Sequence, residues 1–122
     1  MTERRRVLYI EISAPDESLR QFADAWHRAE QGEEVEPFYS VGFESMAELI
    51  STLTPKRWEL IERLHHDGPM SIYALAKLLQ RDYKNVHTDV KALSELEIIQ
   101  ENGDGKVTIP WDEIEAHFKL AA

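Results

Sequence analysis

The 122-residue chain contains no cysteine, which excludes disulfide bonds, thiolate zinc sites and a cysteine nucleophile. It has only five glycines, and none forms a Gly-rich phosphate-binding loop or a Gly-x-Ser-x-Gly nucleophile elbow. No two of its five histidines stand in a His-x-x-x-His pair, the spacing that places two metal ligands on one helix face. We therefore predict no catalytic residues, no cofactor and no metal, and a protein that is not an enzyme.

Long hydrophobic runs are also absent. The apolar run after the basic start of the chain extends only from Val7 to Ile10, which is too short for the core of a signal peptide. No stretch approaches the roughly 18 apolar residues of a membrane span. We therefore expect a cytoplasmic protein without a membrane segment. Because a chain this short leaves much surface exposed, dimerisation would bury more of it, and we predict a homodimer.

Positive charge is scarce, because 14 lysines and arginines stand against 23 aspartates and glutamates, giving a formal net charge of −9. This balance argues against a general nucleic-acid binder, since neutralisation of phosphates by Lys and Arg supplies most non-specific affinity. Residues 1–54 hold five basic and eleven acidic residues (−6), and residues 55–122 hold nine and twelve (−3). Residues 77–91 hold four basic and two acidic residues, so one short segment is basic (+2).

The first part of the chain, residues 1–53, predicts a strand–helix–strand–helix extension. The β-formers of Val7–Ile12 predict a strand, Pro15 a helix start and residues 36–43 a second strand. We expect this part to form a dimer through Val7–Ile12 or to hold a protein partner. The two helices begin at Pro15 and at a capping box of Ser45 and Glu48, with apolar stripes of Leu19, Phe22, Trp26 and Ala29, and of Met46, Leu49, Ile50 and Leu53.

The second part, residues 54–122, contains three helix starts, at Thr54, Ser71 and Asp82. The turn signal Asn102–Gly105 then predicts a β-hairpin. Helix, helix, tight turn, helix and hairpin is the order of a winged helix-turn-helix. The fold class is therefore α+β, a DNA-binding domain with the extension before it. The spacing of Trp111, Ile114, Phe118 and Ala121 predicts a C-terminal helix.

The third helix of this domain has two different faces. Val86, Val90 and Leu93 point inward, while Lys84, Thr88 and Lys91 point nearly opposite at about 100° per residue. Amide, hydroxyl and ammonium groups suit base edges and phosphates, and one α-helix fits the major groove of DNA. The predicted DNA-binding residues are Ser71, Lys77, Arg81, Tyr83, Lys84, Asn85, His87, Thr88, Lys91 and Lys106.

Two functions remain open from the residues alone. The polar face indicates a protein that reads double-stranded DNA, and dimers of such domains read palindromes with two recognition helices. However, every surface helix has a polar face, and many winged helices bind proteins. An interaction module that binds a protein without DNA is therefore the alternative, which the acidic first part favours.

Three segments, Thr54–Arg57, Ser71–Ala76 and above all Arg81–Leu93, resemble winged-helix, MarR/ArsR-like DNA-binding proteins of toxin–antitoxin operons, the TumA-type antitoxins among them. The resemblance covers about residues 45–110. It implies a transcriptional regulator that represses its own operon and a small toxin as protein partner. Members often carry glycine where Gln80 and Glu97 stand here, both outside the predicted reading face.

Overall fold

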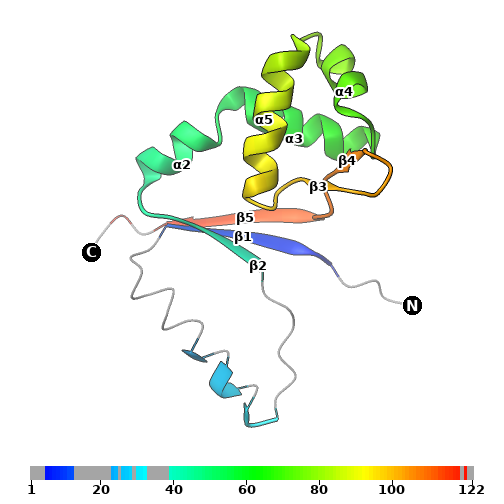
Figure 1. Ribbon diagram of the computed structural model, residues 1–122. Helices are drawn as coiled ribbons and strands as arrows, with labels where there is room; N and C mark the ends of the chain where they lie inside the picture. Colours follow the sequence, from blue (N-terminus) through cyan, green and yellow to red (C-terminus); the bar gives the residue numbers. More distant parts are fainter. Residues whose placement is uncertain are drawn as a thin grey trace. The chain divides into compact units, whose positions relative to one another are not determined.

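The computed structural model describes residues 5–12, 23–24, 26–28, 30–32, 39–118 and 120 of the chain (Figure 1). It is a mixed α and β structure that divides into two compact units. The sheet unit comprises Met1–Thr52 and Glu113–Ala122, and the helical unit comprises Leu53–Asp112. Residues 113–122, which we expected to complete the second domain, are therefore grouped with the first part of the chain.

The sheet unit contains a three-stranded sheet in the order β2-β1-β5. Strand β1 (Val7–Ile12) runs parallel to both β2 (Tyr39–Phe43) and β5 (Glu113–Phe118). The predicted strands at Val7–Ile12 and 36–43 are confirmed over the described residues, and 36–38 lie outside them. Within β1, Leu8 and Ile10 are buried, as the period-2 alternation of a strand requires.

The central position of β1 makes one expectation wrong. We expected Val7–Ile12 to form a dimer contact, but β2 and β5 already occupy its two edges. A strand with both edges paired has no backbone groups left for another chain. Among the described strands of this sheet, the outer edges belong to β2 and β5.

The predicted C-terminal helix is also wrong, because Glu113–Phe118 forms strand β5. The helical spacing of Trp111, Ile114 and Phe118 competed with an alternation in which Ile114, Ala116 and Phe118 occupy every second position. Parallel pairing with β1 from Val7↔Glu113 to Ile12↔Phe118 satisfies the backbone and selects the alternation. Tertiary pairing over a long sequence separation therefore decided this element.

The first predicted helix is described only in part. Residues 23–24, 26–28 and 30 are helical, whereas Pro15, Leu19, Phe22 and Ala29 lie outside the described residues. Trp26, a member of the predicted apolar stripe, is 61% exposed and its indole donates a hydrogen bond to Glu30 Oε1 (2.8 Å).

Helix α2 (Met46–Thr52) begins at the predicted capping residues. The Glu48 backbone N–H donates to Ser45 Oγ (3.1 Å), as expected. The Glu48 carboxylate, however, accepts from the backbone N–H of Glu44 (3.0 Å) rather than from that of Ser45. The reciprocal capping box is thus shifted by one residue at its carboxylate end.

The helical unit contains α3 (Pro55–Asp67), α4 (Ile72–Leu79) and α5 (Tyr83–Glu95), each beginning at its predicted residue. Thr54 Oγ1 accepts from the Arg57 N–H (3.3 Å), and Ser71 Oγ accepts from the Ala74 N–H (3.1 Å). Asp82 precedes α5 in an extended conformation, but its side chain makes no capping hydrogen bond. Two of the three predicted side-chain caps therefore form.

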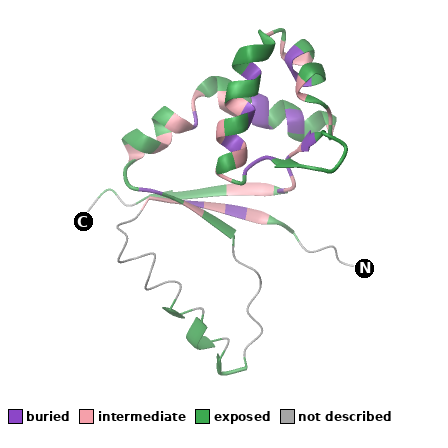
Figure 2. Cartoon of the chain, viewed as in Figure 1, coloured by how far each residue is buried: buried purple, intermediate pink, exposed green. Residues whose placement is uncertain are grey.

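One hydrophobic core holds these three helices together (Figure 2). The buried residues of α5 are Val86, Val90 and Leu93, as predicted. Trp111 lies against the end of this core and donates from Nε1 to the Glu97 carbonyl (3.1 Å). The remaining buried residues of the unit are Leu53, Leu60, Ile61, Leu64, Leu75, Ala76, Ile98, Ile99, Val107 and Ile109.

A β-hairpin follows α5, formed by β3 (Gln100–Glu101) and β4 (Val107–Thr108). Asn102 Oδ1 holds its turn by accepting from the backbone N–H groups of Asp104 and Lys106, each at 3.1 Å. On its other side, Val107 exchanges two backbone hydrogen bonds with Met70, at 2.8 and 3.2 Å. The hairpin is therefore tied to the segment between α3 and α4.

Candidate nucleic-acid interface

Helix α5 places its polar groups on the side opposite its buried stripe. Val86, Val90 and Leu93 are buried, and their spacing of four and three residues places them on one side of the helix. The exposed residues of the helix are Tyr83, Lys84, Asn85, His87, Thr88, Lys91 and Glu95 (Figure 2). All six residues that we predicted on this helix are thus on its exposed surface, and the helical unit itself leaves them uncovered.

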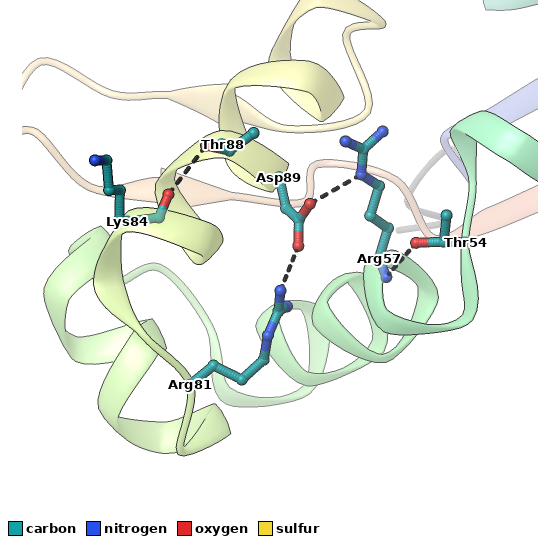
Figure 3. Close-up of polar contacts among 6 residues, drawn as sticks. All are labelled: Thr54, Arg57, Arg81, Lys84, Thr88 and Asp89. Carbon is teal, nitrogen blue, oxygen red and sulfur yellow. Dashed lines mark hydrogen bonds and ion pairs between the residues drawn. The ribbon is translucent and has the colours of Figure 1, made fainter.

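Two contacts order the exposed side chains along the helix. The Tyr83 and His87 rings, one turn apart, lie with centroids 5.9 Å from each other and tilted by 38°. The Thr88 hydroxyl donates to the Lys84 carbonyl (3.0 Å), so it can only accept hydrogen bonds from a ligand in this rotamer (Figure 3). Asn85, between these pairs, offers both an amide donor and an amide acceptor on the surface.

A cluster of three charged side chains lies where the buried stripe of α5 meets its exposed face. Asp89 Oδ1 accepts from Arg57 Nε of α3 (3.0 Å), and Asp89 Oδ2 accepts from Arg81 Nη2 in the turn before α5 (2.7 Å) (Figure 3). The three side chains are only 14–19% exposed. Charge-assisted bonds of this length are among the stronger ones in proteins. We call Arg57, Asp89 and Arg81 the Asp89 clasp.

The clasp changes the electrostatics of the exposed face. Asp89 is one of two acids among residues 77–91, and its charge is neutralised inside the clasp by two guanidinium groups. Lys84 and Lys91 are exposed and point away from it. On α5 itself the exposed charges are then Lys84 and Lys91 against Glu95, a balance of +1 where the composition of the helix gives 0. The +2 of residues 77–91 is unchanged, because the clasp takes up Arg81 together with Asp89.

The predicted residue Arg81 differs from the others in its surroundings. Its side chain is only 18% exposed, and Nη1 is buried without a hydrogen-bond partner. Direct contact with a phosphate would compete with the ion pair to Asp89. The geometry accordingly assigns Arg81 a part in holding α5, and its predicted contact with DNA stays a prediction.

The other predicted residues come from α4 and the hairpin of the same unit. The Lys77 ammonium lies over the Tyr73 ring, 5.2 Å from its centroid, and both side chains are exposed. Ser71 is exposed at the start of α4, where its hydroxyl serves as the cap. Lys106 is exposed at the end of the hairpin turn.

Sequence reasoning missed Asp89 and Tyr73 as components of the surface. The signal for Asp89 was present: it lies three residues after Val86 and directly before Val90, at the edge of the buried stripe. A carboxylate at such a position requires a charged partner, because burial of an unpaired charge is costly. Tyr73 carried no comparable signal, since an exposed tyrosine is compatible with many surfaces.

Other candidate sites in the described residues are accounted for locally. Asp67 is hydrogen-bonded to His66 Nδ1 (3.1 Å) and accepts from Arg63 Nε (2.9 Å), and these hydrogen bonds, that with His66 first, lower the pKa of the Asp67 carboxyl. Among the residues whose positions are described, no three acidic or histidine side chains gather as metal ligands. No described helix has the length and apolar composition needed to cross a bilayer.

Comparison with known proteins identifies one family. Residues 52–116 match the HVO_A0114 family, so the match covers more than half of the 122 residues and the whole helical unit. The chain belongs to this family. No curated protein matches the chain. The family name states no activity or ligand, so function must be argued from the surface of the helical unit.

Proposed function

We propose that this member of the HVO_A0114 family is a sequence-specific DNA-binding transcriptional regulator with a winged helix-turn-helix domain. In this proposal, α5 is the recognition helix, α4 is the helix that crosses the DNA backbone, and the β3–β4 hairpin is the wing. The protein acts as a homodimer and represses its own operon.

The element order of the helical unit supports the winged-helix assignment. Helices α3, α4 and α5 are followed by a hairpin, and the backbone of Met70 between α3 and α4 pairs with Val107 of that hairpin. A short strand segment between the first two helices that adds to the hairpin sheet is the arrangement expected when a wing is anchored beside the recognition helix. Gln80, Arg81 and Asp82 form the tight turn between α4 and α5.

The observation that carries the proposal is the exposed face of α5. It presents Lys84, Thr88 and Lys91 in one outward row with Asn85 beside it, while Asp89 at the margin of the helix is paired within the clasp. A helix of this kind fits a major groove about 12 Å wide, where an Asn side chain can pair with adenine and a Lys with guanine. We propose Ser71, Lys77 and Lys106 as contacts to the flanking phosphates.

A mobility-shift assay on the protein's own promoter, at stated salt, tests this proposal. Asn85→Ala should weaken specific binding by about 5- to 150-fold, the equivalent of 1–3 kcal/mol for a base-reading residue. Glu62→Ala, an exposed change on α3, is the matched control and should leave the affinity unchanged. Equal affinity of wild type for the promoter and for unrelated DNA would contradict sequence-specific regulation.

The resemblance of Thr54–Arg57, Ser71–Ala76 and Arg81–Leu93 to antitoxins of the TumA type extends the proposal to a second partner. The protein would neutralise a small toxin encoded beside it. Co-expression with the neighbouring gene product tests this: the toxin should be tolerated only with this chain and should co-purify with it. Growth arrest that this chain does not relieve would contradict the antitoxin role while leaving DNA binding untouched.

The net charge of −9 favours one alternative, a winged-helix module that binds a basic protein without DNA. The two functions differ in which residues matter. If only protein binding operates, wild type should not shift its own promoter, and a binding partner should be retained by Asn85→Ala and lost on adding salt.

A further inference from the structure

We propose that β5 is a self-pairing edge strand: two copies of the chain join their sheets through antiparallel pairing of β5 with β5, centred on Ala116. This inference deepens the homodimer part of the proposed function, on which it rests, and it does not require DNA binding. It identifies the surface and the register through which a second copy would bind.

The outer edge of β5 offers backbone groups for pairing. The Glu113 N–H donates inward to the Arg6 carbonyl (3.3 Å), on the β1 side. Because the amides of a strand alternate between its two edges, those of Ile114, Ala116 and Phe118 point to the outer edge. In the described sheet, β5 is a terminal strand, and it contains neither proline nor lysine to block pairing.

The side chains of β5 match a sheet that continues into a second copy. Ile114, Ala116 and Phe118 lie in register with Leu8, Ile10 and Ile12 and so share the apolar face. Glu113, Glu115 and His117 lie on the polar face. Phe118 is 45% exposed, and Ala116 is also exposed, so the apolar face reaches the edge uncovered.

Charge selects one register for this pairing. With Ala116 opposite Ala116 of a second copy, Glu115 lies opposite His117 and Ile114 lies opposite Phe118, each pair occurring twice. A neutral or charged imidazole N–H can donate to the carboxylate, and an aliphatic–aromatic pair is favourable. A register centred on Glu115 would instead place two glutamates opposite each other, which is unfavourable.

Strand β2 forms the other edge of the described sheet, and it has no charged side chains that would select a register. Its residues Tyr39–Phe43 carry no charge, so no side-chain pair fixes a register. Residues Glu115 and His117 already lie 3.6 Å apart, between His117 Nε2 and Glu115 Oε2, within one copy. In the antiparallel dimer, Glu115 of each copy would also lie opposite His117 of the other copy, so carboxylates and imidazoles would alternate across the twofold axis.

The absence of cysteine from the chain allows a direct test. Directly opposed residues of a hydrogen-bonded antiparallel pair have Cα atoms about 5.5 Å apart, within the range that a disulfide spans. Ala116→Cys should therefore form a covalent dimer under mild oxidation, at micromolar concentration. Val41→Cys, which lies opposite Ile10 on the other edge strand, is the matched control and should remain uncrosslinked.

Sedimentation of the wild type should give a dimer, and Glu115→Lys should weaken it by about 2- to 30-fold because two cross-strand pairs are lost at once. The double change Glu115→His with His117→Glu exchanges the partners and should restore the affinity. A monomeric wild type, or crosslinking of Val41→Cys in preference to Ala116→Cys, would overturn the proposal.

The same samples separate this inference from the proposed function. The reduced Ala116→Cys protein should bind the promoter as the wild type does. A crosslinked dimer without promoter binding would leave the edge pairing intact and contradict the regulator. A wild type that is monomeric and still shifts the promoter would contradict the edge pairing and leave the regulator intact.

Discussion

At the scale of single residues, Asp89 has the largest structural role of any charged group on α5. It joins α3, through Arg57, to the turn before α5, through Arg81. Mutation of one member of a largely buried ion-pair cluster leaves its partners uncompensated, which costs more than the intact cluster contributes. The clasp therefore fixes the direction in which α5 presents its exposed face.

We expect Asp89→Ala to lower the free energy of unfolding by about 2–3 kcal/mol, measured by urea denaturation, because two guanidinium groups lose their carboxylate. It should also weaken promoter binding at temperatures where the fold is intact, although Asp89 contacts no DNA in the proposal. Glu95→Gln, an exposed change on the same helix, is the control. If Asp89→Ala were as stable as Glu95→Gln, the clasp would have no structural role.

Two other residues adopt a backbone conformation that favours glycine. Gln80 (φ 55°) follows α4 and Glu97 (φ 62°) follows α5. In both places the next backbone N–H, of Arg81 or Ile98, donates to a carbonyl five residues earlier, which is the Schellman ending of a helix. Glycine would adopt this geometry at both positions without a steric penalty.

Gln80→Gly and Glu97→Gly should each raise the free energy of unfolding by about 0.5–1 kcal/mol, because glycine adopts positive φ without steric cost. Thermal unfolding followed by circular dichroism would measure this. Gln100→Gly, in strand β3, is the comparison and should destabilise the protein. A loss of stability in both helix-end variants would show that the positive φ angles of Gln80 and Glu97 do not strain the backbone.

At the scale of elements, the helices of the helical unit were predictable because their signals are local. Caps at Thr54 and Ser71, and the stripe of Val86, Val90 and Leu93, depend on residues within two turns of each other. Strand β5 was not predictable in this way, since its partner β1 lies more than 100 residues earlier in the chain. The Asp89 clasp, likewise, joins Arg57 to a residue 32 positions later.

The hairpin turn is a second element whose stability depends on one side chain. Asn102→Ala should cost about 1–2 kcal/mol in the free energy of unfolding, because the N–H groups of Asp104 and Lys106 both lose the Asn102 Oδ1 acceptor. If β3–β4 is a wing, this variant should also weaken promoter binding. Asp104→Ala, in the same turn, should have a smaller effect on stability, and equal effects would contradict the role of Asn102.

At the scale of the whole molecule, the protein is acidic while its proposed DNA-reading face is locally basic. The net charge of −9 suppresses non-specific attraction to phosphates, so few cations must supply the electrostatic part of binding. This arrangement favours discrimination between sites over affinity for DNA in general.

The salt dependence of promoter binding tests this balance. Lys77→Ala and Lys106→Ala, at the proposed phosphate contacts, should each reduce the slope of log affinity against log salt by about 1 per phosphate contact removed. Glu62→Ala should leave the slope unchanged. Slopes identical to that of the wild type in both lysine variants would place the phosphate contacts elsewhere.

The order of the strands along the chain has a consequence for synthesis. The helical unit is a continuous segment, whereas the sheet requires β1 from near one end and β5 from near the other. During synthesis, β5 is the last of the three strands to be made, after β1, β2 and the whole of Leu53–Asp112. A message that stops early would therefore yield a chain whose helices form but whose β1 has an open side, a product suited to recognition by chaperones or proteases.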